Sequence, residues 1–213
     1  MGTTIRGYGL TEADAAGSRP GAILSGAPAL LASFFTDDRL AKTLLIAALA
    51  PATAPLHRAK AAVAAARRGR KVLVLTERTE HLDAIQTALG GKVPSLFVLH
   101  GRIAKKQRAT LIEELGALPP DAPRVLLATG KLVGEGFDHP PLDTLVLAMP
   151  VSWKGTLQQY AGRLHREHAT KTDVRIIDFV DTGYPALLRM WDKRQRGYRA
   201  MGYRLGSDDA SDF

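Results

Sequence analysis

The sequence predicts an α/β fold of three layers, in which a parallel β-sheet is covered by helices on both faces. From residue 71 onward, short and almost continuously apolar segments recur, as is typical of strands buried on both faces. Most of the gaps between these segments carry apolar residues at helical spacing. Alternating strands and helices indicate a parallel sheet, because each helix crosses back over the sheet before the next strand begins.

The first third of the chain has a different texture. Residues 1–36 are rich in Gly, Ala, Ser and Pro without a sustained period, and we expect a loosely ordered lead-in. Two Ala-rich segments follow, at about 37–50 and 55–68, separated by the sequence PATAP. They predict two helices, which form a helical extension over 37–70.

The remainder is predicted to be one α/β domain over 71–205, followed by an acidic tail at 206–213. The expected strands are 72–75, 96–99, 125–128, 145–148 and 174–180. Expected helices follow the first two strands, with apolar positions Leu82, Ile85, Leu89 and Leu111, Ile112, Leu115, and a basic helix over 185–203 closes the domain. In such sheets ligands bind at the carboxyl ends of the strands, so the residues there are candidates for a site.

Composition narrows the function classes. Lys and Arg total 29 against 21 Asp and Glu, a net charge of +8 that favours a polyanionic partner, nucleic acid first. The absence of Cys excludes disulfides, thiolate metal sites and Cys nucleophiles. The apolar run 43–50 is too short to span a bilayer, and no targeting signal is recognisable, so we expect a cytoplasmic protein without membrane contact.

Several catalytic motifs are missing from the sequence. There is no G-x-x-x-x-G-K-[ST] phosphate loop, no G-x-G-x-x-G after a strand and no G-x-S-x-G elbow. The run from His165 to His168 reads HREH and does not match H-E-x-x-H, so no metal site is expected.

A first candidate site lies in the segment QQYAGRLHR at 158–166. Helical spacing places Gln159, Arg163 and Arg166 on one face, with apolar residues on the other. This face is either a solvated helix surface or an anion clamp, because the planar guanidinium fork suits phosphate.

A second candidate site lies in the segment VLLATGKLVGEGFDHP at 125–140. A buried strand ends at Thr129, and a glycine-punctuated turn then places Lys131 and backbone N–H groups at its carboxyl end. The alternatives are an anion-binding nest and a tight strand-to-helix turn, in which Gly134 and Gly136 only permit the geometry.

In this order, the two segments resemble the second motor domain of superfamily 2 helicases, which has a RecA-like fold. The pattern T...E-G-x-D-x-P resembles motif V, and Q-x-x-G-R-x-x-R resembles motif VI. The segment KVLVLTERTEHL is similar to motif IV, and the run LHG at 99–101 followed by QR at 107–108 is similar to a further helicase segment. The resemblance covers about 71–203 and is nearest to DNA-type helicases of bacterial restriction and conflict systems.

The resemblance implies a role for each matching residue. On the nucleotide side, Arg166 would be the arginine finger that reaches the γ-phosphate of ATP, Arg163 would support the same phosphate, and the remaining contacts would come from Gln159, Gly136 and Asp138. On the nucleic-acid side, contacts to the tracking strand would come from Arg78, Gly101, Thr129 and Lys131.

The resemblance also implies half of an ATP-dependent motor. ATP and Mg²⁺ would be held mainly by a first RecA-like domain carrying the phosphate loop, in cis or in trans, so we expect no ATP hydrolysis by this chain alone. The polyanion would be single-stranded or duplex DNA, with RNA an open alternative. Two other functions stay open: a standalone nucleic-acid-binding or regulatory module without turnover, and an unrelated α/β enzyme using a nucleotide, which no motif supports.

The closing helix combines cations with aromatic residues. Its cations are Arg189, Lys193, Arg194, Arg196, Arg199 and Arg204, and its aromatic residues include Trp191, Tyr198 and Tyr203. Cations with aromatic rings are what a single-strand platform needs, because phosphates attract charge and bases stack on rings. The alternative is that Trp191 and Met190 belong to the core and the arginines are solvated.

Overall fold

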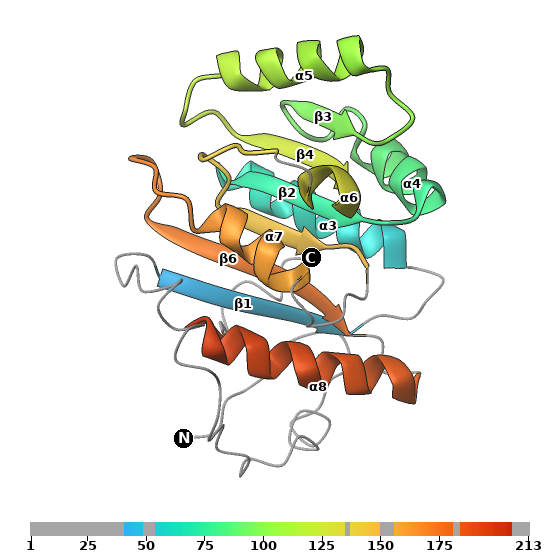
Figure 1. The fold of residues 1–213 in the computed structure, drawn as a ribbon, viewed down its shortest axis with the longest axis vertical. Coiled ribbons are helices and arrows are strands. Elements are labelled where there is room, and N and C mark those ends of the chain that lie inside the picture. The colour runs from blue at the N-terminus through green and yellow to red at the C-terminus, as the bar shows by residue number, and fades with distance from the viewer. Residues whose placement is uncertain (1–40, 49–53, 135–136, 150–155, 181–183, 206–213) are drawn as a thin grey trace.

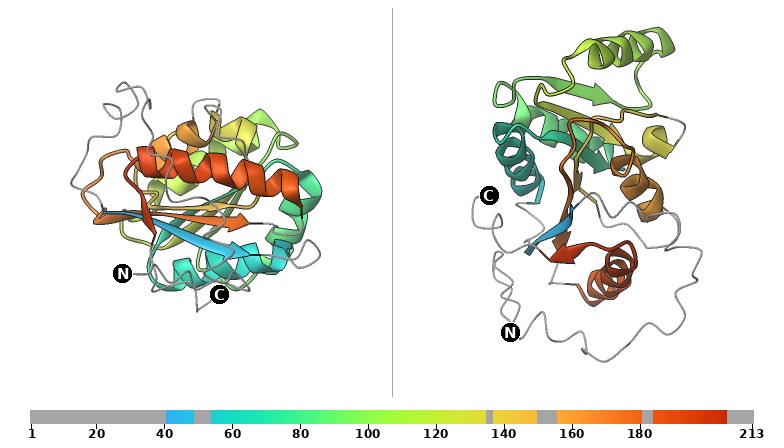
Figure 2. Two further views of the ribbon diagram at one scale, coloured as in Figure 1. Left: turned by 90° about the horizontal axis from the view of Figure 1, so that it is seen from below. Right: turned by 90° about the vertical axis from the view of Figure 1, so that its left-hand side faces the viewer.

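The structure, a computed structural model, describes residues 41–48, 54–134, 137–149, 156–180 and 184–205. These residues form one sheet of seven strands, ordered β3-β4-β2-β5-β6-β1-β7, in which every pair is parallel. Helices lie on both faces of the sheet (Figures 1 and 2), which confirms the three-layer α/β fold.

The elements alternate along the chain. The strands are β1 (Ala41–Ala48), β2 (Lys71–Thr76), β3 (Leu96–Leu99), β4 (Arg124–Thr129), β5 (Thr144–Leu147), β6 (Asp173–Val180) and β7 (Arg204–Leu205). The helices are α3 (Ala54–Arg67), α4 (Thr79–Leu89), α5 (Lys105–Ala117), α6 (Gly130–Gly134), α7 (Thr156–Leu164) and α8 (Pro185–Ala200). All five strands expected after residue 70 are present within one or two residues of their predicted bounds.

The central strands are buried on both faces. In β2, Leu73 and Leu75 point into one core, and Val72 and Val74 point into the other. Helices α3 and α4 cover the second core, while α6, α7 and α8 cover the first. The view from below in Figure 2 shows α3 and α8 on opposite sides of the sheet.

The expected apolar face of α4 is confirmed, and that of α5 is confirmed only in part. Leu82, Ile85 and Leu89 are all buried. In α5, Leu115 is buried but Ile112 is 41% exposed. The reason is that α5 lies against the outer strand β3 at one side of the sheet, where less surface is available to cover it (Figure 1).

The predicted helix over 37–50 is wrong for the residues that the structure describes there. Residues 41–48 form β1, which pairs in parallel with β6 from Ala41 opposite Asp173 to Ala48 opposite Val180. A short apolar run such as TLLIAALA suits a buried strand as well as a helix, and the available partner strand β6 decides between them. The second predicted helix is confirmed as α3.

The proposed division at residue 70 does not follow a structural boundary. Strand β1 belongs to the same sheet as β6, and α3 packs in the same core as β2 and α4. The lead-in 1–36 and the acidic tail 206–213 lie outside the described residues.

A buried ion pair joins α8 to the sheet. The guanidinium of Arg194 donates to both carboxylate oxygens of Asp178 in β6, from Nε at 2.7 Å and from a terminal nitrogen at 3.2 Å. The hydroxyl of Tyr198 donates to the same carboxylate at 2.8 Å. This neighbouring carboxylate raises the pKa of Arg194 despite its burial. The pair of Arg194 and Asp178 therefore has a structural role, because it fastens α8 to β6.

Among the described residues, no helix is both long enough and apolar enough to cross a membrane.

Candidate nucleotide and nucleic-acid sites

Three of the predicted nucleic-acid contacts lie at one edge of the sheet. Thr129 is the last residue of β4, Arg78 follows the end of β2, and Gly101 follows the end of β3. These three strands are neighbours in the order β3-β4-β2, and all run in the same direction, so their carboxyl ends lie side by side. We call the surface formed by Arg78, Gly101 and Thr129 the tracking edge.

The tracking edge is accessible to a ligand. Arg78 and Gly101 are exposed and Thr129 is partly exposed. Arg78 forms an ion pair of 3.1 Å with Glu80, but both side chains are more than two-thirds exposed, so the pair opens at little cost. Lys131, the fourth predicted contact, lies in α6, and its side chain is outside the described part of the chain.

A buried hydroxyl adjoins this edge. Thr76, the last residue of β2, is fully buried, and its hydroxyl has no hydrogen-bond partner among the described residues. Buried polar groups are nearly always paired. A threonine that ends an apolar strand carries no distinguishing signal in the sequence, so this residue was not predicted.

Helices α6 and α7 pack closely against each other just behind the tracking edge. A side chain at Gly130, the first residue of α6, would place its Cβ 2.1 Å from the hydroxyl of Tyr160 in α7. Arg163, also in α7, donates a hydrogen bond of 3.2 Å to the carbonyl oxygen of Val133 in α6. The two segments singled out in the sequence are therefore in direct contact.

The predicted arginine finger lies just beyond α7. The helix ends at Leu164, so the prediction that Arg166 shares a helical face with Gln159 and Arg163 is wrong for Arg166, which belongs to the turn that follows. Its Nε is 3.6 Å from a carboxylate oxygen of Asp138, with the two side chains 57% and 41% exposed. Two residues predicted for the nucleotide side therefore meet on an accessible surface.

The other predicted nucleotide contacts differ in how far the structure describes them. Gln159 is exposed on α7, one turn before Arg163, as the helical spacing predicts. Gly136 lies outside the described residues.

Lys171, which belongs to none of the motifs in the sequence, supports the turn that carries Arg166. Its ammonium group, which is buried, donates hydrogen bonds of 2.7 Å to the carbonyl oxygens of Leu164 and of Arg166. Burial lowers the pKa of Lys171 to about 8, while the carboxylates of Asp143 and Asp138 oppose this shift.

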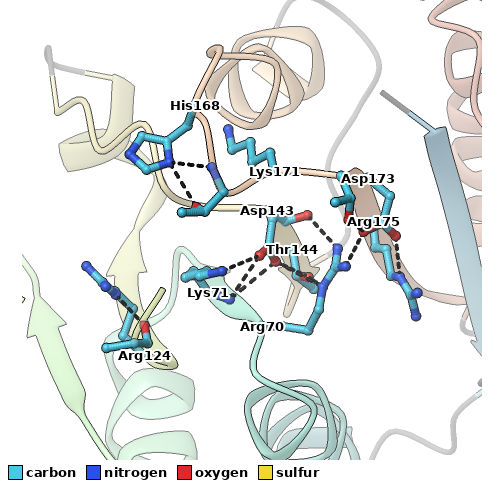
Figure 3. Close-up of polar contacts among 12 residues, drawn as sticks. Arg70, Lys71, Arg124, Asp143, Thr144, His168, Lys171, Asp173 and Arg175 are labelled. Carbon is cyan, nitrogen blue, oxygen red and sulfur yellow. Dashed lines mark hydrogen bonds and ion pairs between the residues drawn. The ribbon is translucent and has the colours of Figure 1, made fainter. Parts of the chain in front are cut away.

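A network of charged groups lies beside Lys171, at the edge of the sheet where the strands begin (Figure 3). Arg70 pairs with Asp143 at 3.0 Å and also with Asp173. The backbone N–H of Lys71 donates to both carboxylate oxygens of Asp143, at 3.2 and 3.3 Å. Burial raises the pKa of Asp143, and Arg70 opposes that shift. This network ties the starts of β2, β5 and β6 together.

His139, which follows Asp138, stays neutral at physiological pH. Its Nε2 lies 3.2 Å from the Arg124 guanidinium, which can only donate, so this nitrogen accepts. Burial and the nearby Arg124 charge lower the pKa of His139 to about 4.

The other two histidines near α7 make local polar contacts. Nε2 of His165 lies 2.9 Å from the hydroxyl of Tyr203, and Nδ1 of His168 lies 2.9 Å from the hydroxyl of Thr170. No group of three or more His, Asp or Glu side chains that could hold a metal ion is found among the described residues.

The single-strand platform suggested for the closing helix is wrong in its aromatic part. Trp191, Tyr198 and Tyr203 are at most 8% exposed and belong to the core. Arg194 is buried against Asp178. The remaining cations of α8 are exposed, so the helix offers charge but no stacking rings.

The parallel sheet with helices on both faces is a RecA-like α/β domain of the kind found in the second half of superfamily 2 helicases. The family described as "Helicase conserved C-terminal domain" matches residues 56–168, which is more than half of the chain. The protein belongs to this family.

Two curated viral proteins are similar in sequence. "Probable helicase D10" of Escherichia phage T5 is 26% identical over 136 residues, which are 64% of this chain and 29% of that protein. "Uncharacterized protein 108L" of Invertebrate iridescent virus 3 is 36% identical over 100 residues, 46% of this chain and 88% of that protein. The chain thus spans less than a third of the phage relative.

Solved structures share the fold. The crystal structure of T4 UvsW matches with a TM-score of 0.61 at 18% identity, over 80% of this chain and 42% of that one. The C-terminal domain of the DEAD-box protein Dbp5 matches with a TM-score of 0.57 at 14% identity, over 79% of this chain and 90% of that one.

Proposed function

We propose that this chain is the second motor domain of an ATP-dependent DNA helicase or translocase. It closes over ATP bound to a first RecA-like domain that carries the phosphate loop, in cis or in trans. The observation that supports this most directly is the setting of Arg166. Its side chain is more than half exposed beside Asp138, and its backbone carbonyl accepts a hydrogen bond from Lys171. A cation displayed on a fixed turn suits a role in reaching a phosphate on another domain.

The nucleotide chemistry follows from charge. In phosphoryl transfer, negative charge spreads over the oxygens of the γ-phosphoryl group, and a guanidinium fork stabilises it by two parallel hydrogen bonds. Arg166 supplies that fork as the arginine finger, and Arg163 supports the same phosphate. Gln159, Gly136 and Asp138 complete the nucleotide side. Asp138 holds Arg166 in the absence of ATP and releases it when the more highly charged phosphate arrives.

ATP and Mg²⁺ are held mainly by the partner domain in this proposal. The chain contains no G-x-x-x-x-G-K-[ST] sequence with which to cradle the phosphates. We therefore expect the isolated chain to hydrolyse no ATP, with or without single-stranded DNA.

The tracking edge contacts the nucleic-acid backbone. Arg78 and Lys131 supply charge to phosphates, Thr129 supplies a hydroxyl, and Gly101 allows close approach of the backbone. Since α6 begins directly after Thr129 and contacts α7, this helix pair connects the tracking edge with Arg166, which lies past the far end of α7, near the edge where the strands begin. This arrangement supports coupling between nucleic-acid binding and hydrolysis.

The second candidate function is a nucleic-acid-binding or regulatory module without turnover. The two functions differ in whether ATP strengthens the association with a phosphate-loop partner. An immunoblot of the source lysate gives the mass of the native polypeptide. A band well above 22.9 kDa favours a motor half within a longer protein, whereas a band at that mass favours a separate subunit or module.

The decisive experiment is an ATPase assay of the native polypeptide, or of this chain with its phosphate-loop partner, in the presence of single-stranded DNA. We expect Arg166→Ala to lower kcat by about 10³-fold, and Arg166→Lys to recover little, because it keeps the charge but loses the fork. Arg67→Ala, an exposed arginine in α3 on the opposite side of the sheet, serves as the matched control. Equal kcat values for Arg166→Ala and Arg67→Ala would refute the finger, and turnover by the isolated chain would refute the proposed half-motor.

A further inference from the structure

The outer face of α8 carries a stripe of exposed cations. Arg189, Lys193 and Arg196 are all exposed. They follow one another at i, i+4 and i+7, which places them within about 60° of each other around the helix. The opposite face of the helix carries the buried side chains of Trp191 and Tyr198. We call these three cations the α8 stripe.

The charges of the α8 stripe are not neutralised by the described residues. None of the three forms an ion pair there, and Asp192 is the only acidic residue of the helix. Among the described residues, Arg196 donates a hydrogen bond of 3.4 Å to the backbone carbonyl of Asp192. Exposed cations of one sign repel each other mildly, and a polyanion that lies along them relieves this repulsion.

The dimensions of the stripe fit a phosphate backbone. Seven residues of helix rise about 10 Å, which is the axial rise of about three phosphates along one strand of DNA. The aromatic rings of this helix are buried and offer no base-stacking surface, so the stripe is suited to bind phosphates and not bases.

The stripe also lies within reach of the tracking edge. Helix α8 follows the carboxyl end of β6, so its first turns begin at the same edge of the sheet as Thr129 at the end of β4. Only β2 and β5 separate β4 from β6, a lateral distance of about 14 Å, and α8 lies further along in the same direction, beside β1 in Figure 1. One DNA molecule can therefore lie against both surfaces.

We infer that the α8 stripe is a second DNA-binding surface, which holds the sugar-phosphate backbone without regard to base identity or strandedness. This inference deepens the proposed function, because the same nucleic acid contacts the tracking edge. Phosphate contacts release counterions, so each contact adds about 0.9 to the slope of log affinity against log salt concentration for duplex DNA.

The test is a salt series of fluorescence anisotropy with the chain as it exists, using a labelled 30-base-pair duplex and a 30-nucleotide single strand. In the variant Arg189→Gln/Lys193→Gln/Arg196→Gln, we expect the slope for the duplex to fall by about 2.7. Between 50 and 200 mM salt, the unmodified chain should therefore lose about 40-fold more affinity than the variant. The side chains are exposed, so the variant is expected to fold.

A control with the same change of charge separates local contacts from net charge. Lys60→Gln/Arg67→Gln/Lys92→Gln removes three exposed cations from the side of α3 and α4, which lies across the sheet from α8. We expect this control to leave the slope unchanged. Equal losses in the two triple variants would overturn the inference, because net charge alone would then account for both.

A single variant at the tracking edge keeps the two proposals distinguishable. If Arg78→Gln lowers the slope for single strands while the stripe variant changes nothing, the stripe is overturned and the tracking edge stands. If the stripe variant lowers both slopes while Arg78→Gln changes nothing, the stripe is supported and the tracking role of Arg78 fails. The inference would also be overturned if the stripe variant lost binding to phosphatidylserine vesicles while its binding to DNA stayed intact.

Discussion

Lys171 and Arg166 are joined through the backbone, because the buried ammonium of Lys171 donates a hydrogen bond of 2.7 Å to the carbonyl oxygen of Arg166. It donates an equal bond to the carbonyl of Leu164, the last residue of α7. The final carbonyls of a helix have no partner within the helix, and here a side chain supplies one. The position of the proposed finger thus depends on a residue five positions further along the chain.

The first prediction concerns the removal of this cap. In Lys171→Met, two carbonyls at a buried site lose their donor, so we expect a loss of about 1–3 kcal/mol in the free energy of unfolding. Backbone amides of 165–168 should also exchange faster with solvent. Urea denaturation and amide hydrogen exchange measure the two effects, with the exposed Lys60→Met as the control. Stability and exchange equal to those of the unmodified chain would show that the cap contributes nothing.

The second prediction concerns the pH dependence of stability. The pKa of Lys171 is about 8 in the native state, against an ordinary value of 10.5. Between these values the unfolded chain binds a proton that the native chain does not, so the contribution of Lys171 to stability rises as pH increases from 8 to 10.5. The difference in unfolding free energy between the unmodified chain and Lys171→Met should therefore grow over this interval. A difference that stays constant would mean that the native pKa is not lowered.

Periodicity predicted the parts of the fold that depend on local sequence. The buried runs of β2, β4 and β5, and the spacing of Leu82, Ile85 and Leu89 in α4, are each readable from a few neighbouring residues. Residues 41–48 were assigned wrongly to a helix, because only their pairing with β6 determines that they form a strand. Local patterns lack the information about which partner is available.

The candidate site was predictable to the same degree. The helical spacing of Gln159 and Arg163 is local, and both residues lie on α7, with Gln159 exposed and Arg163 partly exposed. Lys171 and Asp143 were missed, because their importance comes from the meeting of strand ends and helix ends that are distant in sequence. Arg194 could have been separated from the exposed cations, since it lies three and four positions from Trp191 and Tyr198 on the same helix face.

The third prediction tests the contact between α6 and α7. Gly130→Ala places a methyl group 2.1 Å from the hydroxyl oxygen of Tyr160, so one of the two helices has to move. We expect a destabilisation of about 1–3 kcal/mol, typical of overpacking, with part of it recovered in Gly130→Ala/Tyr160→Phe. Gly116→Ala in α5 is the matched control: the added Cβ meets no described atom within 4 Å outside its own helix, and the change should stabilise the chain by about 0.5–1 kcal/mol. Gly130→Ala as stable as this control would contradict the close packing.

The fourth prediction concerns the ion pair that fixes α8. In Asp178→Ala, Arg194 keeps its charge at a site only 2% exposed and loses the Asp178 carboxylate with which it pairs. Breaking a buried pair in this way costs about 3–5 kcal/mol, whereas replacing both partners by apolar residues is often neutral. We therefore expect Asp178→Ala to be strongly destabilised in urea, and Asp178→Leu/Arg194→Met to recover most of the loss.

Tyr198→Phe completes this comparison. It removes one hydrogen bond to the Asp178 carboxylate but leaves the ion pair, so its expected cost is about 1.5–3 kcal/mol, as for a bond to a charged group. The order of stability should be unmodified chain, Tyr198→Phe, then Asp178→Ala. If Asp178→Ala were the more stable of the two variants, the carboxylate would not be the group that anchors α8, and the orientation of the α8 stripe would need another explanation.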